Sequence, residues 1–183
     1  MRRLILVRHG DAAAGWGDDL DPGLSERGQA QAWRVAESLR PLGPLPVFTS
    51  PLRRCLETAA PIAEQWNVAP AIEPAVGEIK APDHDLATRG PWLASVLGGK
   101  WPELPEEQRA WRDAVVARLL SLTDDCVVVS HFVAINAAIG SATVDDRVVC
   151  HRVGNCSTTM LESDGKSLVL VAALAEAERT EVL

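Results

Sequence analysis

Two short apolar segments that each end in a histidine constrain the fold of this chain more than any other feature. Residues 3–8 are rich in Leu, Ile and Val and lead directly to His9, and residues 126–130 lead in the same way to His131. Apolar runs of this length are typical of buried strands, whereas apolar residues between the two runs recur at helical spacing. This alternation predicts an α/β fold, a three-layer sandwich in which helices cover both faces of a mixed, mostly parallel sheet.

Capping and helix-breaking residues set the limits of the expected elements. Ser25 suits a helix N-cap, and Ser50 followed by Pro51 suits the start of a second helix. Pro61 should kink or shorten that second helix, and Gly140 should end a later one. We expect helices from Ser25 to about Pro41, from Ser50 to about Trp66, over 106–122 and over 133–139, and further strands over 45–49, 70–73, 156–161 and 167–172.

Length and composition predict one folded domain. The chain has 183 residues, of which 47% are hydrophobic and 23% are charged. These values are close to those of ordinary globular domains, so we expect residues 1–183 to form a single domain. Residues 74–103 contain many prolines and glycines and show no clean period, which predicts an irregular lid.

The apolar segments are too short to direct the chain to a membrane. The run at residues 4–7 stops at Arg8, where a signal peptide needs about 7–15 apolar residues. The longest run, Leu168 to Ala175, is far below the roughly 18 residues that span a bilayer. We therefore expect a cytoplasmic protein without a membrane span.

Charge and cysteine spacing exclude two further classes of function. Eighteen Lys and Arg face twenty-five Asp and Glu, and the net charge of −7 opposes binding to nucleic acid. The four cysteines form no C-x-x-C pair and are expected as reduced thiols. Cys150, His151 and Cys156 lack a second closely spaced ligand pair, so buried or half-buried thiols are favoured over a zinc site.

Three groups of polar residues are expected to meet at one edge of the sheet. Ligands of open α/β sheets sit beyond the carboxyl ends of the strands, where residues 8–10, 50–54 and 130–131 follow. Arginines, histidines and a helix N-terminus that face one space form an anion pocket, because guanidinium groups and free backbone N–H groups all donate to oxygen. A phosphoryl group fits this pocket better than a carboxylate does.

Four short motifs in these segments carry a resemblance to a known family. They are Leu6-Val7-Arg8-His9-Gly10, Leu24-Ser25-Glu26-Arg27-Gly28 with Gln31-Ala32, Ser50-Pro51-Leu52-Arg53-Arg54, and Val129-Ser130-His131. In this order, from residue 4 to about residue 140, they resemble the histidine phosphatase superfamily, the phosphoglycerate mutase-like family. The resemblance implies the phosphoglycerate mutase-like form of the α/β fold.

The same resemblance implies roles for individual residues. It implies that His9 takes the phosphoryl group and passes it to water. It further implies that Arg8, Arg54 and His131 hold the phosphate oxygens, and we expect Gly10, Ser50 and Ser130 of these motifs to bind the substrate. Imidazole has a pKa near 6.5, which cationic neighbours lower, so a neutral nucleophilic ring is available near pH 7. The scheme requires neither a metal nor a cofactor.

Structural interpretations stand beside these roles. Both His9 and His131 could be polar residues that are merely satisfied at the end of a strand. Arg53 and Arg54 are adjacent, so on a helix they point about 100° apart and only one can face the pocket. The family spacing selects Arg54 and leaves Arg53 as a solvated charge.

A general acid is needed to protonate the leaving group, and the family commonly supplies it after the third strand. Glu78 is our choice, although Glu73, Asp83 and Asp85 lie nearby and a surface carboxylate remains the alternative. The chain departs from the family where Asp11 follows Arg-His-Gly and where Phe132-Val133-Ala134 follows the second histidine, and these changes leave the substrate open. Asn155 resembles a family position, but a turn asparagine is as well supported.

The sequence thus predicts a metal-independent phosphatase that hydrolyses phosphomonoesters through a phosphohistidine. Its substrate would be a small phosphorylated metabolite or a phosphoprotein, and its oligomeric state stays open. Three different functions remain compatible with the motifs: a phosphohistidine phosphatase, a phosphoglycerate mutase, and a non-catalytic module that binds a phosphorylated ligand on the same scaffold.

Overall fold

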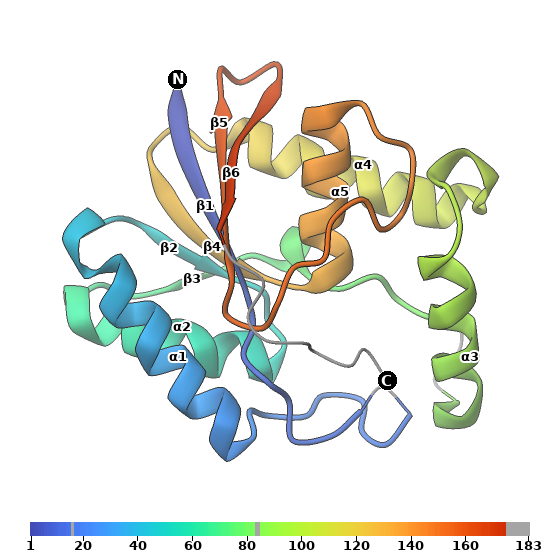
Figure 1. Cartoon of the computed structure of the whole chain (residues 1–183), viewed down its shortest axis with the longest axis horizontal. Helices are drawn as coiled ribbons and strands as arrows, with labels where there is room; N and C mark the ends of the chain where they lie inside the picture. Colours follow the sequence, from blue (N-terminus) through green and yellow to red (C-terminus); the bar gives the residue numbers. More distant parts are fainter. Residues whose placement is uncertain (16, 83–84, 175–183) are drawn as a thin grey trace.

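The described part of the chain, residues 1–15, 17–82 and 85–174 of a computed structural model, contains a six-stranded sheet with helices on both faces (Figure 1). The strands are β1 (Arg2–Arg8), β2 (Val47–Thr49), β3 (Ala71–Ile72), β4 (Cys126–Ser130), β5 (Thr158–Ser163) and β6 (Leu168–Leu174), in the order β3-β2-β4-β1-β5-β6. The first four run parallel, and β5 lies antiparallel to both β1 and β6. The predicted mixed, mostly parallel sheet is confirmed.

Five α-helices and three short 3₁₀ helices connect the strands in the described residues. They are α1 (Glu26–Leu39), α2 (Arg53–Trp66), α3 (Leu86–Leu97), α4 (Glu106–Ser121), α5 (Phe132–Thr143), η1 (Arg40–Leu42), η2 (Pro74–Val76) and η3 (Trp101–Glu103). In Figure 1, α1 and α2 lie on one side of the sheet, α4 and α5 lie on the other, and α3 lies beyond α5. Within the described ranges, no helix combines the length and apolar character needed to cross a membrane.

Strand β1 buries both of its faces, which explains its unbroken apolar sequence. Leu4 and Leu6 pack in a cluster with α4 and α5, whereas Ile5 and Val7 pack in a cluster with α1 and α2. All four side chains are at most 2% exposed. Burying an aliphatic side chain contributes about 1.5–3 kcal/mol, so this strand is central to the stability of both helical layers.

The segment for which the sequence predicts an irregular lid contains a regular helix. Helix α3 occupies residues 86–97 even though Pro91 lies inside it. Leu93 and Val96 pack in a third apolar cluster with Trp101 and Val133. The expectation of irregular structure is therefore wrong for α3, because tertiary packing outweighs the local effect of proline and glycine.

Two predicted helix limits and the expectation that Pro61 shortens its helix also need correction. Helix α2 begins at Arg53 with Leu52 as its N-cap, not at Ser50, and it continues through Pro61. Helix α5 continues past Gly140 to Thr143. A Cβ atom at Gly140 would lie 2.7 Å from the carbonyl oxygen of Asp145, so this glycine permits close packing and does not end the helix.

The topology brings the predicted site residues to one edge of the sheet. Strands β2, β4 and β1 are neighbours and parallel, so their carboxyl ends lie side by side. Arg8 at the end of β1 pairs with Ser130 at the end of β4. His9 and His131 immediately follow these two residues, which places both histidines beyond the same edge.

Candidate active site

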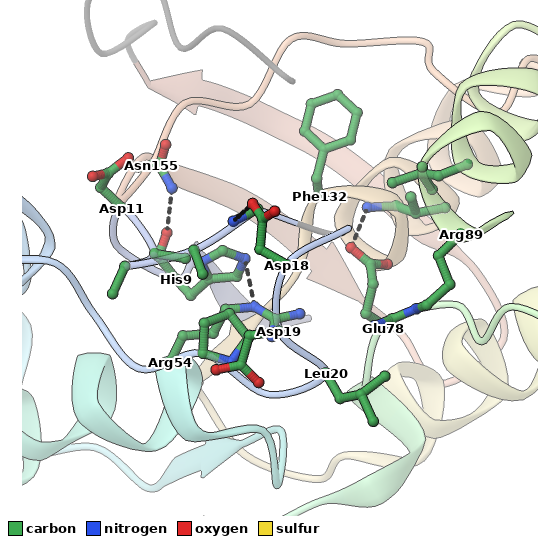
Figure 2. A pocket seen from close by; sticks show the side chains of 18 of the residues that line it. His9, Asp11, Asp18, Asp19, Leu20, Arg54, Glu78, Arg89, Phe132 and Asn155 are labelled. Carbon is green, nitrogen blue, oxygen red and sulfur yellow. Dashed lines mark hydrogen bonds between the residues drawn. The ribbon is translucent and has the colours of Figure 1, made fainter. Parts of the chain in front are cut away.

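A cavity of about 640 Å³ lies beyond this edge of the sheet (Figure 2). Four of the predicted site residues line it: Arg8, His9, Arg54 and Glu78. The remaining lining residues come from the loop of residues 10–24, from α3, from the start of α5, and from Asn155. Arg8 and Arg54 thus form a basic floor next to the sheet, and the loop of residues 10–24, α3 and the start of α5 form the walls.

The ring of His9 is held in one tautomer by the backbone. Its Nδ1 lies 2.7 Å from the carbonyl oxygen of Gly10, and since a carbonyl only accepts, Nδ1 carries the proton. The Nε2 atom of the neutral ring therefore keeps its lone pair. The main chain of His9 is fixed as well, because its N–H donates to Ser130 O at 3.0 Å and its oxygen accepts from Asn155 Nδ2 at 3.1 Å.

Burial keeps this ring neutral. His9 is 8% exposed, and burial together with the charges of Arg54 and Arg8 holds its pKa well below the usual value. A neutral imidazole with a fixed Nδ1–H and an unprotonated Nε2 has the form that a histidine nucleophile needs at neutral pH.

Arg54 joins the two histidines. Its Nε–H donates to Nε2 of His9 at 3.2 Å, and its NH2 group donates to Nδ1 of His131 at 3.2 Å. The Arg54 side chain is 6% exposed, whereas the Arg53 side chain is 66% exposed and pairs with Glu57. The two arginines thus diverge from the start of α2, and Arg54 is the one that faces the cavity.

Arg8 supplies a second buried cation. Its NH1 group donates to Val153 O at 2.7 Å, and its guanidinium lies 5.1 Å from the centre of the Phe132 ring. Burial lowers the pKa of Arg8 to about 10, so it stays charged at neutral pH. Its Nε atom is buried without a hydrogen-bond partner among the described residues.

His131 lies behind the cavity wall. Its side chain is fully buried and is absent from the cavity lining. Nδ1 accepts from Arg54, so the proton of the neutral ring is on Nε2, which donates to Ser50 Oγ at 2.7 Å. Burial, with smaller contributions from His9 and Arg54, holds the pKa of His131 well below its usual value. Its observable role in the structure is to orient Arg54.

The three residues expected to bind substrate also lie behind the wall. Gly10, Ser50 and Ser130 are not part of the cavity lining. Ser130 Oγ donates to Val76 O at 2.7 Å, and Ser50 accepts from His131. The side chains of Ser50 and Ser130 are buried in the interior, where they support the lining residues, and Gly10 lies in the loop after His9.

Glu78 is a buried carboxyl group on the cavity wall. It is 9% exposed, and its two oxygens accept from the backbone N–H groups of Ile79 at 3.0 Å and Val133 at 3.4 Å. Burial raises its pKa above the usual glutamate value. A carboxyl group in this environment holds its proton more readily than a solvated one, as a general acid must.

The carboxylates near Glu78 in the sequence are engaged elsewhere. Glu73 contacts Nε of Arg118, and Asp85 accepts from the N–H of Ala87 at the start of α3. Asp83 lies outside the described residues. Of the described members of this group, Glu78 is the carboxyl that lines the cavity with His9.

Helix α1, which contains most of the motif of residues 24–32, packs against the loop that follows the Arg8-His9-Gly10 motif. A Cβ atom on Gly28 would lie 2.1 Å from Asp11 O, so only glycine permits this approach of α1 to the loop after His9. Ser25 Oγ donates to Asp11 Oδ2 at 2.7 Å, and Asp11 N–H donates to Gln31 Oε1 at 2.8 Å. Helix α1 therefore fixes the loop that carries the carbonyl of Gly10.

Sequence reasoning missed Thr58, which supports the same loop. Gly10 N–H donates to Thr58 Oγ1 at 3.0 Å, and that hydroxyl donates to Arg54 O at 2.7 Å. The available signal was spacing, because residue 58 lies one helical turn beyond Arg54. Sequence reasoning also gave no role to Leu93 and Leu97 of α3, which line the cavity.

The backbone of Cys150 and His151, two of the residues considered for a zinc site, anchors its loop to α5. The backbone N–H groups of Cys150 and His151 both donate to Asn136 Oδ1, at 3.0 and 2.8 Å, which fixes this loop to α5. In the residues that the structure describes, no three or more His, Cys, Asp or Glu side chains gather as a metal site.

Known proteins that resemble this chain include proteins named as phosphatases and proteins named as phosphoglycerate mutases. Phosphoserine phosphatase 1 of Hydrogenobacter thermophilus is 35% identical over 115 residues, 61% of this chain and 51% of the relative. The chain thus matches about half the length of that protein. Glucosyl-3-phosphoglycerate phosphatase of Mycolicibacterium vanbaalenii is 29% identical over 192 residues, covering 88% of this chain and 84% of the relative.

Comparison with solved structures also finds a glucosyl-3-phosphoglycerate phosphatase. A mycobacterial glucosyl-3-phosphoglycerate phosphatase, solved with VO3, superimposes with a TM-score of 0.73 and 26% identity, over 96% of this chain and all of the other. The model of the histidine phosphatase superfamily, branch 1, matches residues 4–174, which include the two histidines, Arg54 and Glu78. This chain belongs to the histidine phosphatase superfamily, branch 1.

Proposed function

We propose that this protein is a metal-independent phosphatase that hydrolyses phosphomonoesters through a phosphohistidine at His9. The observation that carries the proposal is the tautomer of His9, whose Nδ1–H is held by Gly10 O so that the Nε2 lone pair faces the arginine-lined floor. Arg8 and Arg54 provide two positive charges for the phosphoryl oxygens at this floor.

The first step transfers the phosphoryl group to His9. Phosphoryl oxygens accept hydrogen bonds from Arg54 better than a neutral imidazole does, because both partners are charged, so substrate binding frees Nε2. Nε2 then bonds to phosphorus while the P–O bond to the organic group breaks. Glu78 gives its proton to the departing oxygen, which leaves as an alcohol.

The second step releases phosphate. Glu78, now a carboxylate, takes a proton from water as the water oxygen bonds to phosphorus and the N–P bond breaks. His9 regains its lone pair, Glu78 regains its proton, and inorganic phosphate leaves. The Nδ1–H bond to Gly10 O supports the positive charge that the ring carries as long as Nε2 is phosphorylated.

Hydrolysis is favoured over phosphoglycerate mutase activity by the charges of the cavity wall. A mutase must retain a bisphosphorylated intermediate that also carries a carboxylate. Asp18 and Asp19 line the cavity and would repel such an anion. The relatives from Hydrogenobacter and Mycolicibacterium are named as phosphatases of phosphoserine and of a glucosyl phosphoglycerate, which supports a small phosphorylated metabolite as substrate.

The decisive experiment is to trap the intermediate. The protein is mixed with a ³²P-labelled aryl phosphate, quenched in alkali, and analysed for label on His9. We expect a label that acid removes, no label in His9→Ala, and turnover that a chelator leaves unchanged. Absence of both label and turnover would favour a non-catalytic module that binds a phosphorylated ligand.

Metal dependence and the nature of the leaving group distinguish phosphomonoester hydrolysis from two related activities. Turnover that a chelator abolishes and a divalent cation restores would overturn a histidine nucleophile acting alone. A phosphohistidine phosphatase cleaves a P–N bond, whose leaving group needs less help from an acid. Hydrolysis of phosphohistidine but of no phosphomonoester, with Glu78 dispensable, would therefore favour that activity.

A further inference from the structure

Asp21 lies where the loop of residues 10–24 meets the amino end of α2. Its Oδ1 accepts a hydrogen bond from the backbone N–H of Arg53 at 2.9 Å. The same oxygen lies 3.9 Å from NH1 of Arg54. One carboxylate therefore contacts both the helix that carries Arg54 and the guanidinium that we assign to phosphate binding.

The hydrogen bond to Arg53 completes the start of α2. Leu52, the N-cap residue, provides no side-chain cap, and free N–H groups remain in the first turn of such a helix. Asp21 supplies the missing acceptor from a different part of the chain. This bond holds its carboxylate beside Arg54, even though the Asp21 side chain is 47% exposed.

The ion pair with Arg54 is looser than the other contacts of that residue. Nε and NH2 of Arg54 each donate to a histidine at 3.2 Å, whereas 3.9 Å exceeds hydrogen-bond distance. NH1 therefore has a charge partner in Asp21 but no hydrogen bond from it. A phosphoryl oxygen at the usual 2.7–2.9 Å of a charged pair would be the stronger acceptor.

We propose that Asp21 is a positioning residue that competes with the phosphate group for Arg54. This inference rests on the proposed function, because it takes Arg54 as a phosphate ligand. Without substrate, the Asp21 carboxylate pairs with NH1 of Arg54. A bound phosphate group replaces this pairing, and the nearby carboxylate lowers the affinity of the site for the product phosphate. Asp21 thus sets how tightly the phosphate group is bound, while its bond to Arg53 stabilises the helix.

The test separates the charge of Asp21 from its capping bond. Asp21→Asn removes the charge but keeps an oxygen that can accept from Arg53, whereas Asp21→Ala removes both. Glu57→Gln is the matched control, because it removes one charge from the same helix, and Glu57 contacts Arg53 and the N–H of Leu24. Binding of inorganic phosphate at pH 7 is measured by titration calorimetry, which needs no turnover.

We expect Asp21→Asn to bind inorganic phosphate about three- to tenfold more tightly than the wild type, the scale of one nearby charge that is partly screened. Its Tm should stay close to wild type. Asp21→Ala should also bind phosphate more tightly, with a Tm lower by about 2–4 °C from loss of the cap. Glu57→Gln should bind phosphate within about twofold of the wild type.

Two results would overturn the inference, and they are distinguishable. If the wild type binds phosphate and Asp21→Asn binds it equally or more weakly, Asp21 does not compete for Arg54. If the wild type binds no phosphate, the phosphate site of the proposed function is itself absent. Steady-state kinetics add a second readout, because a competing carboxylate predicts a lower KM in Asp21→Asn, and a purely structural residue predicts a change in Tm alone.

Discussion

Burial favours the uncharged form of both His9 and Glu78, to which we assign opposite roles in the proposed reaction. Burial lowers the pKa of the imidazole and raises that of the carboxyl group. A neutral imidazole can attack phosphorus, and a neutral carboxyl can give a proton to the leaving oxygen. The same physical cause therefore favours the protonation states that the proposed nucleophile and the proposed acid need.

Substitution of these two residues should produce different kinetic patterns. We expect His9→Ala to abolish turnover of every phosphomonoester, because the proposed mechanism has no other group that attacks phosphorus. Glu78→Gln should slow alkyl phosphates far more than activated aryl phosphates, whose leaving groups depart without a proton. The measurement is kcat for both substrate classes in each variant. Equal slowing of the two classes, or slowing of neither, would assign the acid to another carboxylate.

The pH dependence should follow the same two groups. The raised pKa of Glu78 keeps its proton to higher pH, so turnover of alkyl phosphates should fall as pH rises through that pKa. The lowered pKa of His9 should keep the ring neutral well into acid, so activity falls only when pH drops below that pKa. In Glu78→Gln the alkaline decline should disappear from the profile of kcat against pH, and its persistence would contradict Glu78 as the acid.

Arg54 and Arg53 provide a test of side-chain direction at the start of α2. Arg54→Ala should cost about 2–4 kcal/mol of transition-state stabilisation, the scale of a lost donor to a developing oxyanion. Arg53→Ala should stay near wild type, because its side chain is 66% exposed and pairs with Glu57. The comparison uses kcat/KM for one aryl phosphate, and the reverse ranking would contradict the observed geometry.

At the scale of elements, Gly28 links helix α1 to the loop after His9. Gly28→Ala would force a Cβ atom to within 2.1 Å of Asp11 O, so the loop or the helix must move. We expect a loss of about 1–3 kcal/mol in the free energy of unfolding and a fall in kcat. Denaturant unfolding provides the first value and steady-state kinetics the second.

Gly90→Ala in α3 is the matched control for this prediction. A Cβ atom at Gly90 would meet nothing within 4 Å. In a helix, alanine is favoured over glycine, so this variant should be as stable as the wild type or gain up to about 1 kcal/mol. Similar destabilisation of both variants would contradict the close packing of Gly28 against Asp11.

The elements that could be predicted from sequence are those whose signal is local. Buried strand β1 was visible as an apolar run, and the N-cap at Ser25 is confirmed because its hydroxyl accepts from Gly28 N–H at 3.0 Å. Helix α3 could not be predicted, since its sequence contains Gly90 and Pro91. Its support comes partly from residues that are distant in the sequence, such as Val133 and Val148.

For the candidate site, the positions of residues along the strands could be predicted from the sequence, but the directions of their side chains could not. Residues that follow strand ends, such as His9, could be placed together by topology alone. The direction of each side chain could not, so the position of Ser130 behind the wall emerges only in the structure. The roles assigned to these residues are predictions that the kinetics of the variants test.

At the scale of the whole molecule, the charge distribution separates the phosphate site from the rest of the cavity. Arg8 and Arg54 lie at the floor, next to the sheet, whereas Asp18 and Asp19 belong to the wall formed by the loop of residues 10–24. This loop contains four aspartates and no lysine or arginine. Arg89 of α3 also lines the cavity, and it already takes part in another interaction of the protein. In the proposed function one phosphate group binds at the floor, and further negative charge on the substrate would face carboxylates.

We therefore predict that phosphatase activity exceeds phosphoglycerate mutase activity. A mutase passes through a bisphosphorylated, carboxylate-bearing intermediate, which must stay bound during two phosphoryl transfers, and this requires cations beyond those at the floor. The assay supplies 3-phosphoglycerate with a trace of 2,3-bisphosphoglycerate and compares 2-phosphoglycerate formed with inorganic phosphate released. Double substitution of Asp18 and Asp19 by Asn should raise kcat/KM for 3-phosphoglycerate more than for an aryl phosphate without a carboxylate, because the removed charges act most strongly on that extra negative group. Isomerisation that outruns hydrolysis in the wild type would overturn the assignment to a phosphatase.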